Sequence, residues 1–192
     1  NPSMIRRALT SDVSAFGQII NNAAETGSML HRSLAELYEN VRNFHIAVEN
    51  DQVVGVCGLK VVWADLAEIY ALAVTQEMRG RGWGRRLVQA CIADARSVGT
   101  RRLMSLTYEK TLFQKLGFAV VDRQQLPLKV WSECLRCSKN KCCDEIAMIY
   151  VLEDLPTLTE SVPAVPQPGE YVVPEELKIG AKQNRQKMDE AR

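Results

Sequence analysis

The residues Arg79-Gly80-Arg81-Gly82-Trp83-Gly84, followed by Arg85, form a glycine- and arginine-rich turn in the middle of the chain. The apolar run 69–74 before the turn is typical of a buried strand, and apolar positions after it recur on one helical face until Gly99. Glycines at a helix start let main-chain N–H groups surround a phosphate, and the helix dipole adds about half a positive charge. We therefore expect a pyrophosphate site, with an unliganded surface turn as the alternative.

The spacing of these glycines separates the turn from two common phosphate loops. A P-loop would require Gly-Lys-Ser or Gly-Lys-Thr after four spacer residues, and a dinucleotide fingerprint would require Gly-x-Gly-x-x-Gly near the first strand. Here the glycines occupy alternate positions deep in the chain. The pattern that is present, Arg-x-x-Gly-x-Gly after a strand, resembles the acyl-CoA loop of the GNAT N-acetyltransferases.

Length and composition are those of an ordinary globular protein. The 192 residues are enough for one domain with a core plus a tail, and 46% of them are hydrophobic against 24% charged. A net charge of +1 argues against bulk binding to nucleic acid or to a membrane surface. The start of the chain lacks the apolar core of a signal peptide, and six cysteines without such a signal indicate a reducing cytoplasm.

Hydrophobic periodicity and turn residues predict the element order β-α-α-β-β-β-α-β-α-β-β. Strands are expected over residues 4–8, 44–49, 52–61, up to 74, 102–108, 118–122 and 145–152, with a hairpin turn at Asn50-Asp51. This is the order of the GNAT fold. The resemblance implies an α/β protein with a mixed central sheet, a splayed strand pair and helices on both faces.

Four helices are expected between these strands. They are a helix capped by Thr10 or Ser11, a helix capped by Ser33, the helix after the glycine-rich turn, and a short one over 111–116. The second is expected to turn four apolar side chains inward: Leu34, Leu37, Tyr38 and Val41. Prolines accumulate after residue 156, so we expect a GNAT domain over 4–152 and a proline-rich linker with a charged C-terminal tail over 153–192.

The resemblance to the GNAT enzymes extends over residues 4–152 and includes a second segment, Leu112-Phe113-Gln114-Lys115-Leu116-Gly117-Phe118. In that family the pantetheine arm lies where the strand before the loop parts from its neighbour. The resemblance therefore implies that main-chain groups of Leu72, Ala73 and Val74 bind this arm, and that an N–H near Val74 stabilises the thioester oxyanion.

Acetyl transfer to an amine requires a group that removes a proton, because a free amine is largely protonated at neutral pH. Glu68 begins the strand that carries the acyl site and is followed by apolar residues, so we expect it to act as the base, directly or through water. A solvated carboxylate is the alternative. Phe113 stands where many GNAT enzymes have a tyrosine acid, and Tyr108 is a substitute candidate.

One branch of the superfamily matches more closely, the stand-alone form of N-acetylglutamate synthase that lacks an amino-acid-kinase domain. The matching segments are Leu30-His31-Arg32-Ser33, Cys57-Gly58-Leu59-Lys60, Ala67-Glu68-Ile69, Leu106-Thr107 and Leu126-Pro127-Leu128-Lys129-Val130-Trp131. This resemblance implies direct attack by the α-amino group of an acidic amino acid, L-glutamate above all, on acetyl-CoA in a ternary complex. It would be the first step of arginine biosynthesis, with small molecules as partners and a homodimer as one possible assembly.

A dicarboxylate acceptor requires cations at two places. We expect Arg32 to bind the α-carboxylate with two parallel hydrogen bonds, which a lysine could not form. Lys60 and Lys129 are the candidates for further carboxylate contacts, and Thr107 can donate a hydroxyl. Each cation alone is also compatible with a solvated surface charge.

A cysteine cluster lies between the last two predicted strands. Cys134 and Cys137 have the spacing of a zinc half-site, and Cys143 can add a third sulfur beside its neighbour Cys142. A structural Zn²⁺, a disulfide and free thiols all remain open. Cys57 and Cys91 are expected in the core.

Two other functions fit the same fold. One is acetylation of another amine, such as a protein lysine, an N-terminus or a polyamine, and the other is acyl-CoA sensing without turnover. Cationic acceptors would favour a pocket lined with acids, which Arg32, Lys60 and Lys129 argue against.

Overall fold

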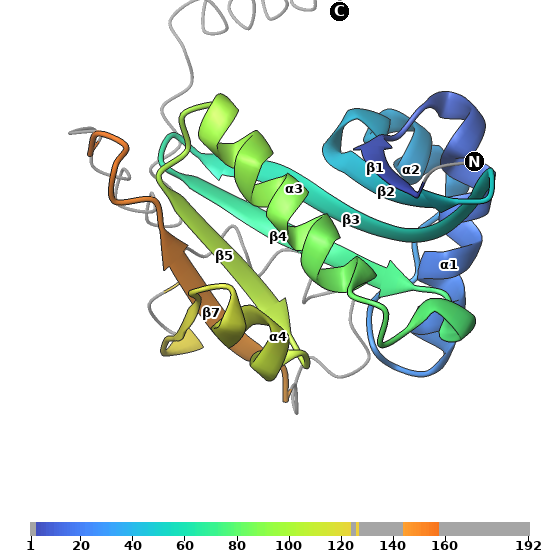
Figure 1. Cartoon of the computed structure of the whole chain (residues 1–192). Helices are drawn as coiled ribbons and strands as arrows, with labels where there is room; N and C mark the ends of the chain where they lie inside the picture. Colours follow the sequence, from blue (N-terminus) through green and yellow to red (C-terminus); the bar gives the residue numbers. More distant parts are fainter. Residues whose placement is uncertain (1–2, 124–125, 127–143, 158–192) are drawn as a thin grey trace, which may run out of the picture. The chain divides into compact units, whose positions relative to one another are not determined.

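A mixed sheet of seven strands forms the centre of the computed structural model, which describes residues 3–123, 126 and 144–157 (Figure 1). Its strand order is β1-β2-β3-β4-β5-β7-β6. The strands are β1 (Met4–Arg7), β2 (Phe44–Glu49), β3 (Gln52–Trp63), β4 (Leu66–Val74), β5 (Arg102–Thr107), β6 (Ala119–Val120) and β7 (Ile146–Val151). The helices are α1 (Val13–Glu25), α2 (Leu34–Glu39), α3 (Trp83–Ser97) and α4 (Lys110–Lys115). The predicted element order is confirmed.

The described residues belong to one compact unit, Asn1–Glu160. The predicted linker and tail begin at residue 153 and lie largely outside the described part, so that boundary stays a prediction. Lys129, Cys134, Cys137 and Cys143 also lie outside it. No helix in the described part is both long and apolar enough to pass through a bilayer.

Strands β4 and β5 run parallel and separate after a short ladder. Three residue pairs join them, from Leu66↔Arg102 to Glu68↔Met104, while β4 continues to Val74 and β5 to Thr107. Figure 1 shows the two strands diverging beyond this point. The predicted splayed pair is therefore confirmed, and Glu68 lies where the separation begins.

A bulge in β4 changes which side chains face each side of the sheet. Val56 pairs with Ala73 and Gly58 with Tyr70, so three steps along β4 match two along β3. Ala71 absorbs the extra residue with a φ of 51°. The bulge lies between the buried end of β4, which carries Glu68 and Tyr70, and the end that leads into the glycine-rich turn.

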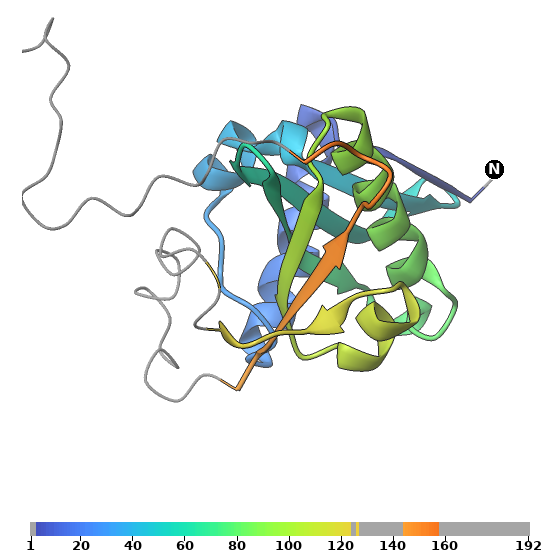
Figure 2. The same cartoon turned by 90° about the vertical axis from the view of Figure 1, so that its left-hand side faces the viewer.

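Helices cover both faces of the sheet, as Figure 2 shows for α1 and α3. On one face, α1 and α2 bury apolar residues such as Phe16, Ile20 and Leu37 against Phe44 and Val56. On the other face, the predicted apolar stripe of α3 packs on the sheet together with Phe113 of α4, and the stripe includes Leu87, Val88, Cys91 and Ala95. The core thus fixes α3 and its N-terminus relative to β4.

Three local predictions are wrong. Leu34 and Tyr38 are 52% and 48% exposed, and Leu37 is the buried residue of α2. Val41 packs inward as expected, but from the following turn, η2 (Val41–Asn43). Neither Thr10 nor Ser11 caps α1; they belong to a 3₁₀ turn, η1 (Thr10–Asp12). Strand β6 has two residues rather than five. The cap on α2 is confirmed, since the Glu36 N–H donates to Ser33 Oγ at 3.1 Å.

Asp12 joins β1 to the start of α1. Its carboxylate accepts hydrogen bonds from Arg6 at 2.7 and 3.0 Å and from the Leu9 N–H at 2.7 Å. The Arg6 hydrogen bond lowers the pKa of Asp12 below its ordinary value; burial opposes this, and the Leu9 N–H adds to it.

Because the folded pKa of Asp12 is depressed, its stabilisation is complete above the unfolded pKa of about 3.9 and is lost as the pH falls through the folded pKa. We expect Asp12→Asn to lower the free energy of unfolding at pH 7 and to lose this effect as the pH falls through the depressed folded pKa of Asp12. Urea unfolding across this range measures it, with Glu39→Gln as the exposed control. A difference that is constant with pH would contradict the assignment.

Candidate active site

The turn before α3 has the geometry of an anion site. Gly80 and Gly82 adopt φ angles of 75° and 82°, and a Cβ added at either would meet nothing within 4 Å. Gly82 is the N-cap of α3, and the Arg86 N–H donates to its carbonyl at 3.1 Å. The first N–H groups of the helix therefore end at an open space, where an anion would be stabilised.

The side chains around this turn divide into two groups. The Trp83 indole is buried and stacks under the Arg86 guanidinium at 4.3 Å, so Trp83 can serve a ligand through its main chain. Arg79, Arg81 and Arg85 are exposed beside the open space. All three can add positive charge to the site. Arg79 Nε also donates to the Val74 carbonyl at 3.4 Å and so links the turn to the end of β4.

The end of β4 offers main-chain groups to the splayed side. The Thr75 N–H donates to the Val54 carbonyl at 2.9 Å, which marks this pair as hydrogen-bonded in the β3–β4 ladder. Since bonding alternates along an antiparallel pair, Ala73 also directs its main-chain groups to β3, whereas Leu72 and Val74 direct theirs toward β5. Two of the three residues predicted to bind the pantetheine arm thus face the gap.

The predicted base and one predicted carboxylate ligand contact each other. Glu68 and Lys60 are partners across β4 and β3, and Lys60 Nζ lies 2.9 Å from Glu68 Oε2. The Glu68 side chain is 9% exposed and that of Lys60 is 25% exposed. Glu68 is therefore buried, unlike the solvated carboxylate that was its alternative, and its role as a base stays a prediction. Its carboxylate lies beside an ammonium at the point where the strands separate.

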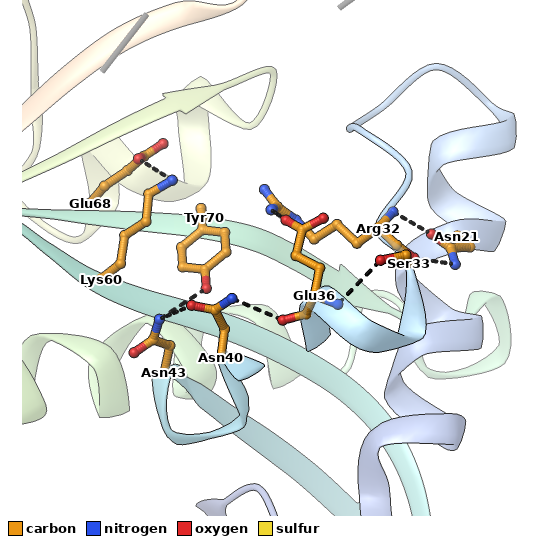
Figure 3. Close-up of polar contacts among 9 residues, drawn as sticks. All are labelled: Asn21, Arg32, Ser33, Glu36, Asn40, Asn43, Lys60, Glu68 and Tyr70. Atoms are coloured by element: carbon orange, nitrogen blue, oxygen red, sulfur yellow. Dashed lines mark hydrogen bonds and ion pairs between the residues drawn. The ribbon is translucent and has the colours of Figure 1, made fainter. Parts of the chain in front are cut away.

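A pocket of about 50 Å³ lies on the α1/α2 face of the sheet, lined by Arg32, Glu36, Leu37, Asn40, Phe44, Lys60 and Tyr70. Figure 3 shows Tyr70 between the two cations of this set. The Arg32 guanidinium lies 4.8 Å from the centre of the Tyr70 ring, and Lys60 Nζ lies 4.6 Å from it. The pocket therefore holds two cations at a separation fixed by one aromatic ring.

Arg32 is fixed from several directions. Asn21 of α1 binds its main chain on both sides, donating to the Arg32 carbonyl at 3.0 Å and accepting from its N–H at 2.9 Å. Arg32 Nη1 donates to Glu36 Oε1 at 2.5 Å, and the Arg32 side chain is 8% exposed. A buried guanidinium held this firmly is suited to bind a carboxylate.

The remaining predicted residues have other surroundings. Thr107 Oγ1 accepts from the Glu109 N–H at 2.8 Å, and Thr107 is not among the residues that line the Arg32 pocket in the described part of the chain. Phe113 is buried edge-on against Phe118 at 5.0 Å, and its ring has no acidic group that could supply a proton. Tyr108 donates to Asp144 at 2.8 Å.

Two cysteines expected in the core, Cys57 and Cys91, are buried as free thiols. Across residues 3–123, 126 and 144–157, no group of three or more potential ligands could hold a metal ion. The cysteines proposed for zinc lie outside these ranges, so zinc at that cluster stays a prediction.

Sequence reasoning missed Tyr70 and Glu36. Tyr70 follows Glu68 by two residues, a spacing that places both side chains on one face of a strand. Glu36 stands three residues after Ser33, in the pattern of a capping box, yet its side chain turns to Arg32. The two-residue spacing from Glu68 could have identified Tyr70 from the sequence. The capping-box pattern predicts a helix cap for Glu36 and not a contact with Arg32.

Gly58 provides the space for Tyr70. A Cβ on Gly58 would lie 2.6 and 2.8 Å from two atoms of the Tyr70 ring and 3.0 Å from Phe44. We expect Gly58→Ala to displace the ring and to lower the free energy of unfolding by about 1–3 kcal/mol. Thermal unfolding measures this, with Gly84→Ala as control, because a Cβ there would meet Leu112 at an ordinary 3.5 Å. Equal stability of the two variants would contradict the steric argument.

The family follows from a comparison with known proteins. Residues 16–118 match the model of the acetyltransferase (GNAT) family. The chain belongs to the GNAT family. An uncharacterized N-acetyltransferase of Chlorobaculum tepidum, CT2212, is 36% identical over 77% of this chain and 96% of that protein. An amino-acid acetyltransferase of Mycobacterium tuberculosis is 35% identical over 77% of this chain and 86% of that protein.

The fold is also similar to that of a solved structure. N-acetylglutamate synthase from Neisseria gonorrhoeae, complexed with coenzyme A and N-acetyl-glutamate, aligns with a TM-score of 0.69 and 27% identity. The alignment covers 79% of this chain and 35% of that one. Together with the family match, this confirms the predicted GNAT fold and the resemblance to the N-acetylglutamate synthase branch. The chain is thus an acyltransferase of the GNAT type.

Proposed function

We propose that this GNAT protein transfers the acetyl group of acetyl-CoA to the α-amino group of an acidic amino acid, with L-glutamate as the preferred acceptor. The observation that carries the proposal is the pair of cations on the Tyr70 ring, Arg32 and Lys60, in one pocket. A dicarboxylate has two anionic groups for these two cations. The amino-acid acetyltransferase and N-acetylglutamate synthase relatives support the same acceptor class.

In the proposed complex, the CoA diphosphate binds the open turn at Gly80–Gly84, and the pantetheine arm binds the main-chain groups of Leu72 and Val74. Relatives that bind CoA support acetyl-CoA as the cosubstrate. The α-amino nitrogen attacks the thioester carbonyl carbon, the C–S bond breaks, and CoA leaves as a thiolate. An N–H near Val74 stabilises the oxyanion formed in between.

Glu68 is the proposed acceptor of the amine proton, directly or through a water. It lies where β4 and β5 separate, between the acyl end of the proposed CoA site and the Lys60 end of the pocket. One proton must leave the ammonium before attack and a second must leave after it. Lys60, which contacts Glu68, positions this carboxylate as well as facing the pocket.

Thr107 and Lys129 stay proposed substrate contacts. The placement of this reaction at the start of arginine biosynthesis also stays a proposal. The domain boundary at residue 152, a cytoplasmic location and a homodimer likewise stay proposals.

A thiol-release assay with acetyl-CoA tests the proposal against its alternatives. The acceptors are L-glutamate, L-aspartate, L-glutamine, spermidine and a lysine peptide. Highest kcat/KM with glutamate supports the proposal, although a single methylene separates glutamate from aspartate by only about 10- to 200-fold. Turnover with spermidine or the peptide alone would contradict it, as would CoA binding without any turnover.

A further inference from the structure

Glu36 lines the pocket and carries a negative charge, as does the proposed dicarboxylate substrate. Its Oε1 accepts from Arg32 Nη1 at 2.5 Å, on the guanidinium where the acceptor carboxylate is expected. The main chain of Glu36 is fixed at both ends: its N–H donates to Ser33 Oγ at 3.1 Å, and its carbonyl accepts from Asn40 at 2.8 Å. The carboxylate is therefore held beside Arg32 by the start of α2, as Figure 3 shows.

The two carboxylates that contact the pocket cations differ in exposure to solvent. The Glu68 side chain is 9% exposed and projects from β4, a strand inside the sheet, beside Lys60. The Glu36 side chain is 26% exposed and projects from a helix of six residues at the surface. Glu36 can therefore turn toward solvent when another carboxylate takes its place on Arg32, whereas Glu68 is buried beside Lys60.

We propose that Glu36 is a resident carboxylate that occupies Arg32 in the empty pocket and sets the affinity for acidic acceptors. This inference rests on the proposed function. A substrate carboxylate that binds Arg32 with two parallel hydrogen bonds requires the guanidinium edge that Glu36 contacts, and two carboxylates on one guanidinium repel each other. Acceptor binding is thus an exchange of one carboxylate for another, and Glu36 acts through Arg32 as a positioning and specificity residue.

The exchange makes the pocket selective between acceptors with and without a carboxylate. An acceptor with a carboxylate that reaches Arg32 can replace Glu36, whereas an amine without a carboxylate leaves the Arg32–Glu36 pair in place. The resident carboxylate thereby disfavours anions that bind Arg32 weakly, while an α-carboxylate that forms two hydrogen bonds still binds. A polyamine does not displace Glu36 and gains no contact with Arg32.

Steady-state kinetics of Glu36→Gln and Glu39→Gln test the inference at saturating acetyl-CoA. Both variants remove one negative charge from α2, but Glu39 is exposed and outside the pocket. We expect Glu36→Gln to lower the KM for L-glutamate about fivefold with kcat within about twofold, and Glu39→Gln to change neither. Glu36→Asp, whose shorter side chain reaches Arg32 less well, should lower KM in the same direction and covers the case in which Glu36→Gln folds poorly.

A second readout is the rise in melting temperature on addition of L-glutamate, which should be larger for Glu36→Gln than for the unmodified protein. An unchanged or raised KM in Glu36→Gln and Glu36→Asp would overturn the inference, as would an equal decrease in Glu39→Gln. These results leave the proposed function intact, provided that the unmodified protein acetylates glutamate. Absence of turnover with any acidic amino acid would overturn both.

Discussion

Replacing Arg32 by alanine is expected to raise the KM for L-glutamate by at least about tenfold and to leave the KM for acetyl-CoA unchanged. The guanidinium is buried, and the cation on the Tyr70 ring is lost with it. A charge-assisted bidentate contact contributes about 1.5–3 kcal/mol, which corresponds to roughly 10- to 150-fold in affinity. The Glu36 carboxylate remains in the pocket and adds repulsion to the loss.

Initial-rate kinetics with each substrate varied in turn measure this effect. Arg32→Lys separates charge from geometry: it keeps one positive charge but cannot form the two parallel hydrogen bonds, so KM should stay well above that of the unmodified protein. Arg42→Ala is the control, because Arg42 is an exposed arginine in the turn after α2. An unchanged glutamate KM in Arg32→Ala would remove Arg32 from the acceptor site.

Replacing Gly82 by valine is expected to abolish measurable acetyl-CoA binding. Gly82 has a φ of 82°, a region that a β-branched residue rarely adopts, and its Cβ would enter the open space before α3. The side chain would occupy the position proposed for the diphosphate and also disturb the N-cap that directs the helix N–H groups. We expect a loss of at least about 100-fold in affinity, equivalent to about 2.7 kcal/mol.

Gly99→Val is the matched control for this experiment. Gly99 follows the other end of α3 with a φ of 78°, and a Cβ there also meets nothing within 4 Å. Both variants should lower the melting temperature by a similar amount, because the backbone strain is the same in kind. Calorimetric titration with acetyl-CoA should show binding to Gly99→Val and none to Gly82→Val. Equal dissociation constants for the two would contradict the assignment of the turn.

The parts of this fold that the sequence predicted well carry local signals. The stripe of α3 that includes Leu87, Val88 and Cys91 has the helical period, and it is buried as expected. Asn50 and Asp51 were expected in a hairpin turn, and both have positive φ angles. The glycine pattern predicts unusual backbone angles at a strand–helix junction, and Gly80 and Gly82 both adopt left-handed backbone conformations. In each case the pattern depends on neighbours within a few residues.

The parts that were missed depend on register and packing between distant segments. Glu68 and Lys60 were proposed for separate roles, but the β3–β4 register makes them cross-strand partners. That register includes irregularities near Gly58 and Val61. Gly58 inside a strand is a sequence signal for a bulge, but it does not determine which residues of the two strands become partners. Tyr70 enters the site because Gly58 faces it across the strands. Leu34 opens α2 and is 52% exposed, although the apolar period places it on the same helical face as Leu37, which is buried.

The most direct test is a crystal structure of the protein with CoA and L-glutamate bound together. The account predicts the CoA diphosphate on the main-chain N–H groups of residues 79–84 and the glutamate α-carboxylate on the Arg32 guanidinium, with Glu36 turned away from it. The amino nitrogen should face the CoA sulfur from the Tyr70 side of the sheet. A diphosphate bound elsewhere, or a glutamate outside the pocket of Arg32, Tyr70 and Lys60, would contradict the account.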